Sequence, residues 1–352
     1  MNNKETISSF FTKVLNGTAT ASIIALIPFA VLGLIFKQFP NSQMAMDVHS
    51  ILEIFQYLTP VMVGFLIARN FDLDQMEELV VGGAAFIGSG AWIYNEVLID
   101  PQTAEYIFQL KGIGDLINTM ITASLAVIAV KLIGKKLGSL KIILLPIIIG
   151  AGVGYIGFLI LPTVSTLTSL VGEAINTFAT LQPYLMSILI SMSFAILIVT
   201  PMSTVAIGIA IGLSGLSAAA ASMGIAATTA VLIFGTVKRN PAGVPLAIGL
   251  GAMKMMMPNF LLNLKIGIPM LITAAISGLS VPIFNLVGTP ASSGFGLVGL
   301  VGPIASLESP SVNVFIMILS WFIIPFVVGF ISNFVCEKVI HLYEPQAFVF
   351  KG

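Results

Sequence analysis

The stretch from Gly288 to Pro310, GTPASSGFGLVGLVGPIASLESP, lies between two long apolar segments and decides the fold. It holds eight glycines or serines before its first charge, which is Glu308. In a helix interior, Gly is less favourable than Ala by about 1 kcal/mol and Pro by about 3 kcal/mol. A run with this many of them cannot be one regular helix. In a bilayer, broken backbone is tolerated only where protein buries it or where it lines a water-filled cavity. We therefore expect a re-entrant loop that lines a substrate cavity, with Glu308 at or near the site.

The composition predicts a multi-pass membrane protein, surrounded by the lipid bilayer. Of 352 residues, 57% are hydrophobic and only 9% are charged, whereas soluble domains average about 25% charged residues. Fifteen Lys and Arg balance fifteen Asp and Glu, so nothing indicates a nucleic-acid partner. The lone cysteine, Cys336, and the two separated histidines make no ligand pattern, and we expect neither a metal nor a cofactor. No catalytic triad or phosphate-binding loop is present, which leaves open whether the protein takes part in an enzymatic reaction.

Long apolar segments predict an all-α polytopic protein with about ten transmembrane helices and two re-entrant hairpins, because one crossing needs about 20 apolar residues. We expect residues 1–162 to form a five-helix N-terminal domain, whose fifth span ends at Pro162. Residues 163–182 carry apolar side chains mostly at spacings of three and four, which favours an amphipathic connector in the interface over a polar-faced span. We expect residues 183–352 to form a transport-type domain with hairpins at 240–263 and 288–310. The expected spans are 19–36, 51–68, 79–98, 116–130, 142–161, 184–199, 202–216, 218–237, 266–287 and 312–334.

The positions of the basic residues test this topology, because Lys and Arg are in excess in cytoplasmic loops. The most basic loop runs from Lys131 to Lys141, and a second basic cluster is Lys238-Arg239. Ten spans and two hairpins place both clusters on the cytoplasmic side together with Lys265 and Lys338. The same arrangement places both termini in the cytoplasm.

The first segment that could carry chemistry is Thr200-Pro201-Met202-Ser203-Thr204. Pro suits the first turn of a helix and Ser or Thr suits its cap. A helix that begins here inside the membrane would direct unpaired N–H groups at a polar solute, as broken helices do in transporters. A capped helix start at the membrane surface explains the pattern equally well. Thr200, Ser203 and Thr204 are the candidate solute ligands.

The second segment is the expected hairpin 240–263, which contains Lys254 and Asn259. A lysine at membrane depth is costly, so it is paired, reaches the interface, or is functional. Asn259 has both donor and acceptor groups that a polyol requires, although the broken backbone could use the same groups. A Lys254–Glu308 ion pair between the two hairpins is a further possibility that the sequence leaves open.

The third segment is the opening stretch itself. Its hydroxyl side chains suit a neutral, hydroxylated solute; they are Thr289, Ser292, Ser293, Ser306 and Ser309. Glu308 is the only acid between Glu173 and Glu337, and an isolated acid within the membrane is a functional candidate. The alternative is that Pro310 marks a span boundary, where an acid beside the headgroups costs little.

The layout of the whole chain resembles enzyme IIC, the membrane subunit of the phosphotransferase system. The segments TPMSTVAIGIAIGLSGLSAAAASMG and GTPASSGFGLVGLVGPI carry the likeness to a branch of stand-alone IIC-like proteins, some described as regulators resembling the perfringolysin regulator. The resemblance implies a location in the bacterial cytoplasmic membrane, a homodimer through the first half and an elevator-like movement of the second half. It also implies a sugar bound between the hairpins, with Glu308 in the place of a glutamate that contacts the sugar. The family's sugar-binding members show Gly-Ile-Thr-Glu there, whereas this chain has Ala-Ser-Leu-Glu-Ser-Pro.

Three functions follow as hypotheses. The first is a transporter for a small hydroxylated or weakly anionic solute, most simply a sugar or polyol, served by separate soluble IIA and IIB proteins or working without them. The second is a membrane sensor or regulator that binds a ligand without group translocation. The third is an ion-coupled carrier that uses Glu308 as the proton or cation site.

Overall fold

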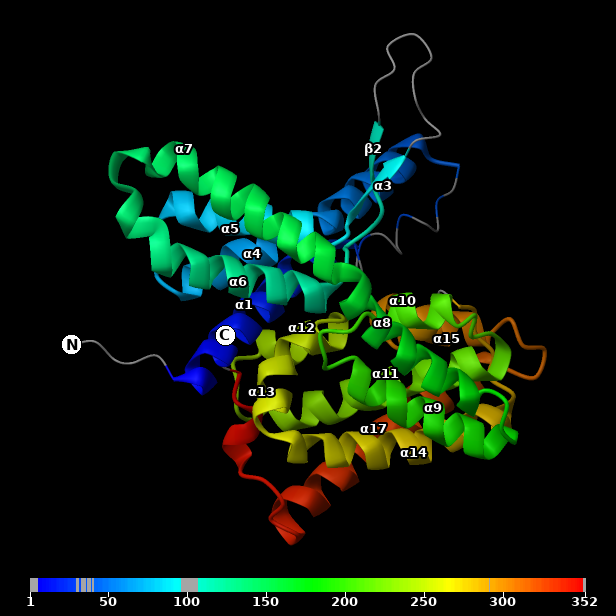
Figure 1. Ribbon diagram of the computed structural model, residues 1–352. Helices are drawn as coiled ribbons and strands as arrows, with labels where there is room; N and C mark the ends of the chain where they lie inside the picture. The colour runs from blue at the N-terminus through cyan, green and yellow to red at the C-terminus, as the bar shows by residue number, and fades with distance from the viewer. Residues whose placement is uncertain are drawn as a thin grey trace. The chain divides into compact units, whose positions relative to one another are not determined.

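The computed structural model of the protein describes residues 6–29, 32, 36, 39, 41–95, 107–290 and 292–350. The chain divides into two compact units, with unit 1 comprising Met1–Phe29 and Phe39–Thr166, and unit 2 comprising Ala30–Gln38 and Leu167–Gly352. The division falls within one helix, α8 (Gly154–Phe178). Helices dominate both units (Figure 1).

Unit 1 is a helical unit with one apolar core that several of its helices share. Buried side chains of α4 (Thr59–Asn70), α5 (Gln75–Gly88) and α6 (Leu116–Ile133) form this cluster together with buried side chains of α1 (Ile7–Pro28) and η4 (Pro146–Val153). Asn118 on α6 donates its side-chain amide to the Gly157 carbonyl on α8 at 2.8 Å, which ties these two helices together. The elements of unit 1 before α8 are α1 (Ile7–Pro28), α3 (Gln43–Tyr57), α4 (Thr59–Asn70), α5 (Gln75–Gly88), β1 (Trp92–Asn95), β2 (Ile107–Leu110), α6 (Leu116–Ile133), η3 (Gly134–Leu140), α7 (Lys141–Leu145) and η4 (Pro146–Val153).

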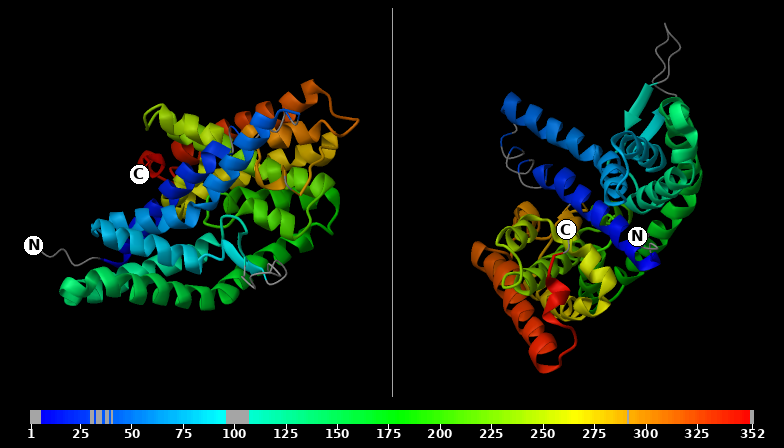
Figure 2. Two further views of the ribbon diagram at one scale, coloured as in Figure 1. Left: turned by 90° about the horizontal axis from the view of Figure 1, so that it is seen from above. Right: turned by 90° about the vertical axis from the view of Figure 1, so that its left-hand side faces the viewer.

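The third expected span, 79–98, differs in the structure. Helix α5 ends at Gly88, and β1 pairs antiparallel with β2, with Trp92 opposite Leu110 (Figure 2). The positive φ of +70° at Gly90 turns the chain out of the helix, a conformation that glycine adopts without steric cost. Residues 96–98 lie outside the described part of the chain.

Pro162 lies inside α8 instead of ending a span. The helix continues from Gly154 to Phe178, and the Thr166 hydroxyl donates to the Pro162 carbonyl at 2.8 Å. Neighbouring helices and Ser or Thr side chains allow membrane helices to tolerate such prolines. Residues 163–178 of the predicted connector 163–182 therefore continue the preceding helix, residues 179–182 lie beyond its end, and the interfacial position of the connector stays a prediction.

Unit 2 is organised around α11 (Gly215–Thr236), which is buried along most of its length. It packs against α9 (Pro183–Leu197), α14 (Gly267–Phe284) and α17 (Ile324–Phe334). Figure 1 shows α11 among these helices. Such burial fits its sequence, because a helix that is apolar all round belongs in a core. The other elements of unit 2 are α9 (Pro183–Leu197), α10 (Thr204–Ala210), α12 (Gly243–Leu250), η5 (Met253–Met256), α13 (Met257–Leu262), η6 (Leu264–Ile266), α14 (Gly267–Phe284), η7 (Ser292–Gly294), η8 (Val298–Leu300), α15 (Val301–Ser306), α16 (Val314–Ile318), η9 (Leu319–Ile323), α17 (Ile324–Phe334), η10 (Val335–Val339) and η11 (Pro345–Phe348).

Two glycines allow the core helices of unit 2 to approach closely. A Cβ at Gly224 of α11 would lie 2.0 Å from the Ser191 carbonyl oxygen on α9. A Cβ at Gly278 of α14 would lie 2.8 Å from the Ser187 carbonyl oxygen, also on α9. Small residues at helix contacts are the usual means of tight packing in membranes, as the Gly- and Ala-rich second half predicts.

Within the described residues, four helical runs are long and apolar enough to cross a membrane, or five if the pair α3 and α4, bent by 43°, is one span. The four are Leu116–Phe178, Gly215–Thr236, Leu264–Phe284 and Val314–Val339. The seventh expected span, 202–216, contains the 7-residue helix α10 and the first two residues of α11. At a rise of about 1.5 Å per residue, α10 covers about a third of a hydrocarbon core. The ten-span count is therefore not confirmed and stays a prediction.

Candidate functional site

Both of the glycine- and proline-rich segments identified in the sequence are broken helices, and they contact each other within unit 2. In segment 240–263, α12 ends at Leu250, and the following Gly251 has a φ of +127°. In segment 288–310, Gly296, Gly299 and Leu300 all have positive φ. A Cβ at Gly251 would lie 2.9 Å from Val298 Cγ1, so the break of the first segment abuts the second. The sequence located both breaks, but not their contact.

Lys254 connects the first of these segments to the Thr200–Thr204 segment. Its ammonium donates to the carbonyl oxygens of Thr200 at 2.6 Å and of Met202 at 2.7 Å. Among the described residues no ion pair joins it to a carboxylate, so the Lys254–Glu308 pair is not formed in this conformation. Lys254 thus satisfies carbonyls that the helix break between α9 and α10 leaves without backbone partners.

The Thr200–Thr204 segment also contacts the second broken segment. The Thr204 hydroxyl is buried and donates to the Gly294 carbonyl at 2.9 Å. A Cβ at Gly208, one turn further along α10, would lie 1.9 Å from Ser293 Oγ. Ser203 is the N-cap of α10 and accepts from the Ala206 amide at 3.2 Å, as its position before the helix predicts.

Three hydroxyls of the second segment close a tight turn. Ser292 Oγ accepts from the Thr289 amide at 2.8 Å, while Thr289 Oγ1 accepts from the Ser292 amide at 3.1 Å. Ser293 Oγ donates to the Pro290 carbonyl at 2.7 Å. Ser292 and Ser293 are buried, whereas Thr289 is half-buried. Their hydroxyls therefore already have partners within the turn.

Glu308 lies at the other end of segment 288–310, with Ser306 and Ser309. Ser306 Oγ accepts from the indole N–H of Trp321 at 3.1 Å and donates to the Pro303 carbonyl at 2.6 Å. The Ser309 and Ser311 hydroxyls are 3.1 Å apart. Glu308 itself is exposed in the turn that follows α15. The predicted residues therefore form two groups, one around Lys254 and one around Glu308.

Asn259 belongs to neither group. Its side-chain amide donates to the carbonyls of Ala347 at 2.9 Å and Val349 at 2.7 Å. It borders an open hollow of about 790 Å³ between the end of segment 240–263, the end of η10 and the C-terminal segment, whose lining includes Lys265, Lys338 and His341. Nearby, burial raises the pKa of the Tyr343 phenol, which keeps its proton and donates to Asn333 Oδ1 at 2.8 Å.

The sequence analysis missed Ser222, a buried residue in the middle of α11. Its hydroxyl donates to the Ser292 carbonyl at 2.8 Å and accepts from the Gly296 amide at 3.1 Å. One side chain therefore satisfies two backbone groups of the broken segment 288–310. The available signal was a serine among alanines in an otherwise apolar helix, which is also ordinary for helix packing.

Comparison with known proteins gives the family. A profile described as phosphotransferase system, EIIC, matches residues 12–350, which is nearly the whole chain. The chain belongs to the EIIC family of the phosphotransferase system. The likeness to enzyme IIC that the sequence indicated is thereby confirmed.

Among solved structures, the crystal structure of the transporter ChbC, the IIC component from the N,N'-diacetylchitobiose-specific phosphotransferase system, aligns with this EIIC-family chain. The alignment covers 93% of this chain and 94% of ChbC, at 14% identity and a TM-score of 0.44. No curated protein matches the chain. EIIC proteins are integral membrane proteins, so family membership supports a membrane transporter of the phosphotransferase type.

Proposed function

We propose that this EIIC-family protein carries a small hydroxylated solute, a sugar or polyol, across the cytoplasmic membrane as a homodimer. Unit 2 carries the solute and moves in an elevator-like manner, with segments 240–263 and 288–310 as re-entrant hairpins. Separate IIA and IIB proteins supply phosphotransfer where transport is coupled to it. The observation that supports this proposal is the convergence of three broken segments, 200–204, 240–263 and 288–310, through the Lys254 and Thr204 hydrogen bonds.

Broken helices provide what a polar solute requires inside a membrane. They present backbone N–H and C=O groups that a continuous helix would use internally, and transporters bind substrates at such discontinuities. Thr200, Ser203 and Thr289 are half-buried where these segments meet, so we assign the solute contacts to this group first. Lys254 holds the carbonyls of Thr200 and Met202 in place beside it.

Glu308 is the second part of the proposed site. It is exposed in this conformation, and among the described residues it has no ion-pair partner. A carboxylate accepts strong hydrogen bonds from sugar hydroxyls. We therefore assign Glu308 to solute contact in the conformation in which segment 288–310 faces the bound solute.

Ligand-dependent thermal stabilisation of the purified protein tests the proposal across sugars, polyols and small acids. A ligand that binds the folded state raises the unfolding temperature as its occupancy increases. We expect a sugar or polyol to give a shift that Glu308→Gln abolishes. Glu173→Gln, which changes another exposed acid, should leave the shift intact. A shift that is equal in wild type and Glu308→Gln would remove Glu308 from the site.

The alternative is a sensor that binds a ligand without moving it, and the sequence around Glu308 favours this alternative specifically. Where sugar-binding members have Gly-Ile-Thr-Glu, this chain has Ala305-Ser306-Leu307-Glu308. The Ser306 hydroxyl already accepts a hydrogen bond from the indole N–H of Trp321. Uptake of the stabilising ligand into proteoliposomes separates the two functions. Uptake above that of protein-free vesicles supports transport, whereas binding without uptake supports a sensor.

A further inference from the structure

The C-terminal segment 345–350 lies between two asparagines at opposite ends of segment 240–263. Asn240 donates to the Phe348 carbonyl at 2.8 Å and accepts from the Phe350 amide at 2.7 Å. Asn259 donates to the carbonyls of Ala347 at 2.9 Å and Val349 at 2.7 Å. Residues 348 and 350 thus face Asn240, while residues 347 and 349 face Asn259. Residues 345–348 form the single turn η11, and Val349 after it is extended.

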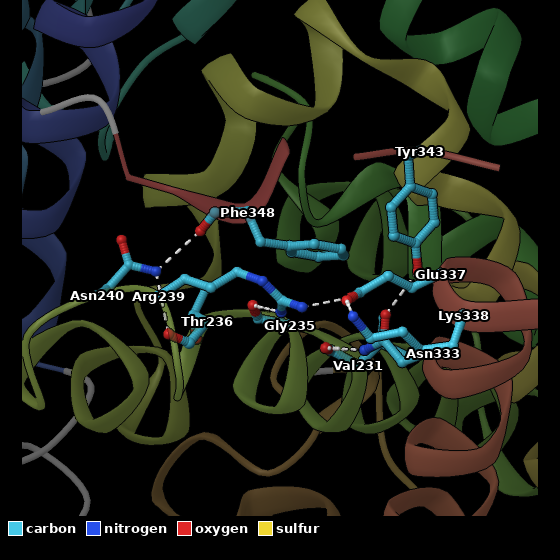
Figure 3. Close-up of polar contacts among 10 residues, drawn as sticks. All are labelled: Val231, Gly235, Thr236, Arg239, Asn240, Asn333, Glu337, Lys338, Tyr343 and Phe348. Atoms are coloured by element: carbon cyan, nitrogen blue, oxygen red, sulfur yellow. Dashed lines mark hydrogen bonds and ion pairs between the residues drawn. The ribbon is translucent and has the colours of Figure 1, made fainter. Parts of the chain in front are cut away.

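A single aromatic side chain anchors this segment. Phe348 is fully buried and packs edge-on against the Tyr343 ring, with the ring centroids 5.4 Å apart. A Cβ at Gly235 of α11 would lie 2.4 Å from Phe348 Cδ1, so the glycine makes the socket for the ring. Figure 3 shows Phe348 beside the end of α11, where Asn240 reaches its carbonyl.

The elements beneath the segment hold together without it. Arg239 at the end of α11 forms an ion pair with Glu337 of η10 and also donates to the Gly235 carbonyl (Figure 3). Asn333 donates to the Val231 carbonyl at 2.7 Å, which joins α17 to α11. Release of segment 345–350 therefore leaves the contacts between α11 and α17 in place.

One side of the segment is open. The hollow of about 790 Å³ is bordered by Asn259 on one side and by Tyr343 to Ala347 on the other. Glu344, Pro345 and Gln346 are exposed. The buried Asn259 Oδ1 has no partner among the described residues, so this contact is incompletely satisfied. The asparagine side chains and the Phe348 ring hold the segment beside this hollow, so its release breaks no sheet and none of the core helices of unit 2.

We propose that residues 345–350 are a detachable latch that holds segment 240–263 against the rest of unit 2. While Phe348 occupies its socket, Asn240 and Asn259 are joined through residues 347–350, and the ends of segment 240–263 are held together. When residues 345–350 leave, α13 is freed from its contact with η11. The latch is a device of the fold that acts whatever the solute, so its test does not depend on the proposed transport function.

The test is cysteine accessibility in the full-length protein with Cys336→Ala, which removes the one native cysteine. The reporter is Met257→Cys, a buried position at the start of α13. The reference is Met223→Cys, a buried position in α11. Each is combined with Phe348→Ala, and the rate of labelling by a water-soluble maleimide is measured in detergent.

We expect Phe348→Ala to raise the labelling rate at position 257 at least tenfold and to leave position 223 unlabelled. Val349→Ala, which keeps the backbone contacts and changes a half-exposed side chain of 37% exposure, is the matched control and should label as the parent does. Equal rates at position 257 with and without Phe348 would overturn the latch. Equal acceleration at positions 257 and 223 would also overturn it, because the segment would then stabilise the whole unit.

Asn240→Asp provides a second opening variant that keeps Phe348. It replaces the donor to the Phe348 carbonyl with a carboxylate oxygen, which repels that carbonyl. We expect the same increase at position 257, with Asn263→Asp as the control at the other end of segment 240–263. If Phe348→Ala fails to fold, an unchanged rate in Asn240→Asp overturns the proposal.

Discussion

Lys254 shows how a single charged side chain can be accommodated in a largely apolar domain. Its ammonium has no carboxylate partner among the described residues and instead donates to two carbonyls of the break between α9 and α10. Hydrogen bonds from charged groups contribute more than neutral ones, and a buried acceptor left without its donor is costly. The residue therefore has a structural role in this conformation, in addition to the solute role proposed for its surroundings.

Lys254→Met tests that structural role. Methionine keeps most of the side-chain length but donates to neither carbonyl, so we expect the free energy of unfolding to fall by about 1–3 kcal/mol. Thermal unfolding of the purified protein is the measurement. Lys265→Met removes an exposed lysine and should have little effect, and equal unfolding temperatures for the two variants would contradict the role given to Lys254.

Asp74 gives a pH-dependent prediction. It caps α5 by accepting from the Glu77 amide at 3.0 Å, and it contacts Lys141. The hydrogen bond from Lys141, followed by that from the Glu77 backbone, lowers the pKa of Asp74 below its ordinary value. A lowered carboxyl pKa stabilises the fold above the pKa of the unfolded chain, which is about 3.9, and the contribution is lost as the pH falls through the folded value.

We therefore expect Asp74→Asn to lower the unfolding temperature by a constant amount between about pH 5 and pH 8. The difference from wild type should shrink below about pH 4, as the wild-type carboxyl takes up its proton. Thermal unfolding across that range is the measurement. A difference that grows toward acid pH would have the wrong sign for this contact.

At the scale of elements, the packing of α11 depends on how closely its neighbours approach. A methyl group at Gly224 would lie 2.0 Å from the Ser191 carbonyl oxygen of α9, so this position has no room for any side chain. Added volume in a packed core costs about 1–3 kcal/mol, and here the obstacle is backbone, which cannot rotate away. We expect Gly224→Ala to destabilise the protein by at least that amount in thermal unfolding.

Gly243→Ala is the matched control for that change. A Cβ at Gly243, the first residue of α12, meets no atom within 4 Å. Alanine has the higher helix propensity, by about 1 kcal/mol in a helix interior, so this variant should be neutral or slightly stabilising. Similar losses in both variants would show that helix packing is not the cause.

At the scale of the whole molecule, the membrane topology of segment 240–263 can be measured by labelling. If the segment is a re-entrant hairpin, its two ends lie on one side of the membrane. Single cysteines at Lys238 and Lys265, both exposed, placed in Cys336→Ala, should then react with an impermeant maleimide from the cytoplasmic side only. Reaction of the two positions from opposite sides would show that the segment crosses the membrane.

The sequence by itself determined the membrane class, the EIIC likeness and the two breaks at 240–263 and 288–310, because composition and the positions of Gly and Pro act locally. It did not determine that Lys254 bonds to the carbonyls of Thr200 and Met202, or that Ser222 serves the second segment, since those contacts join residues 52 to 74 positions apart. The sequence alone also predicted a full span over α10 and the end of a span at Pro162. Only the tertiary structure decided these points, because the satisfaction of a broken backbone depends on which side chains the packing brings to it.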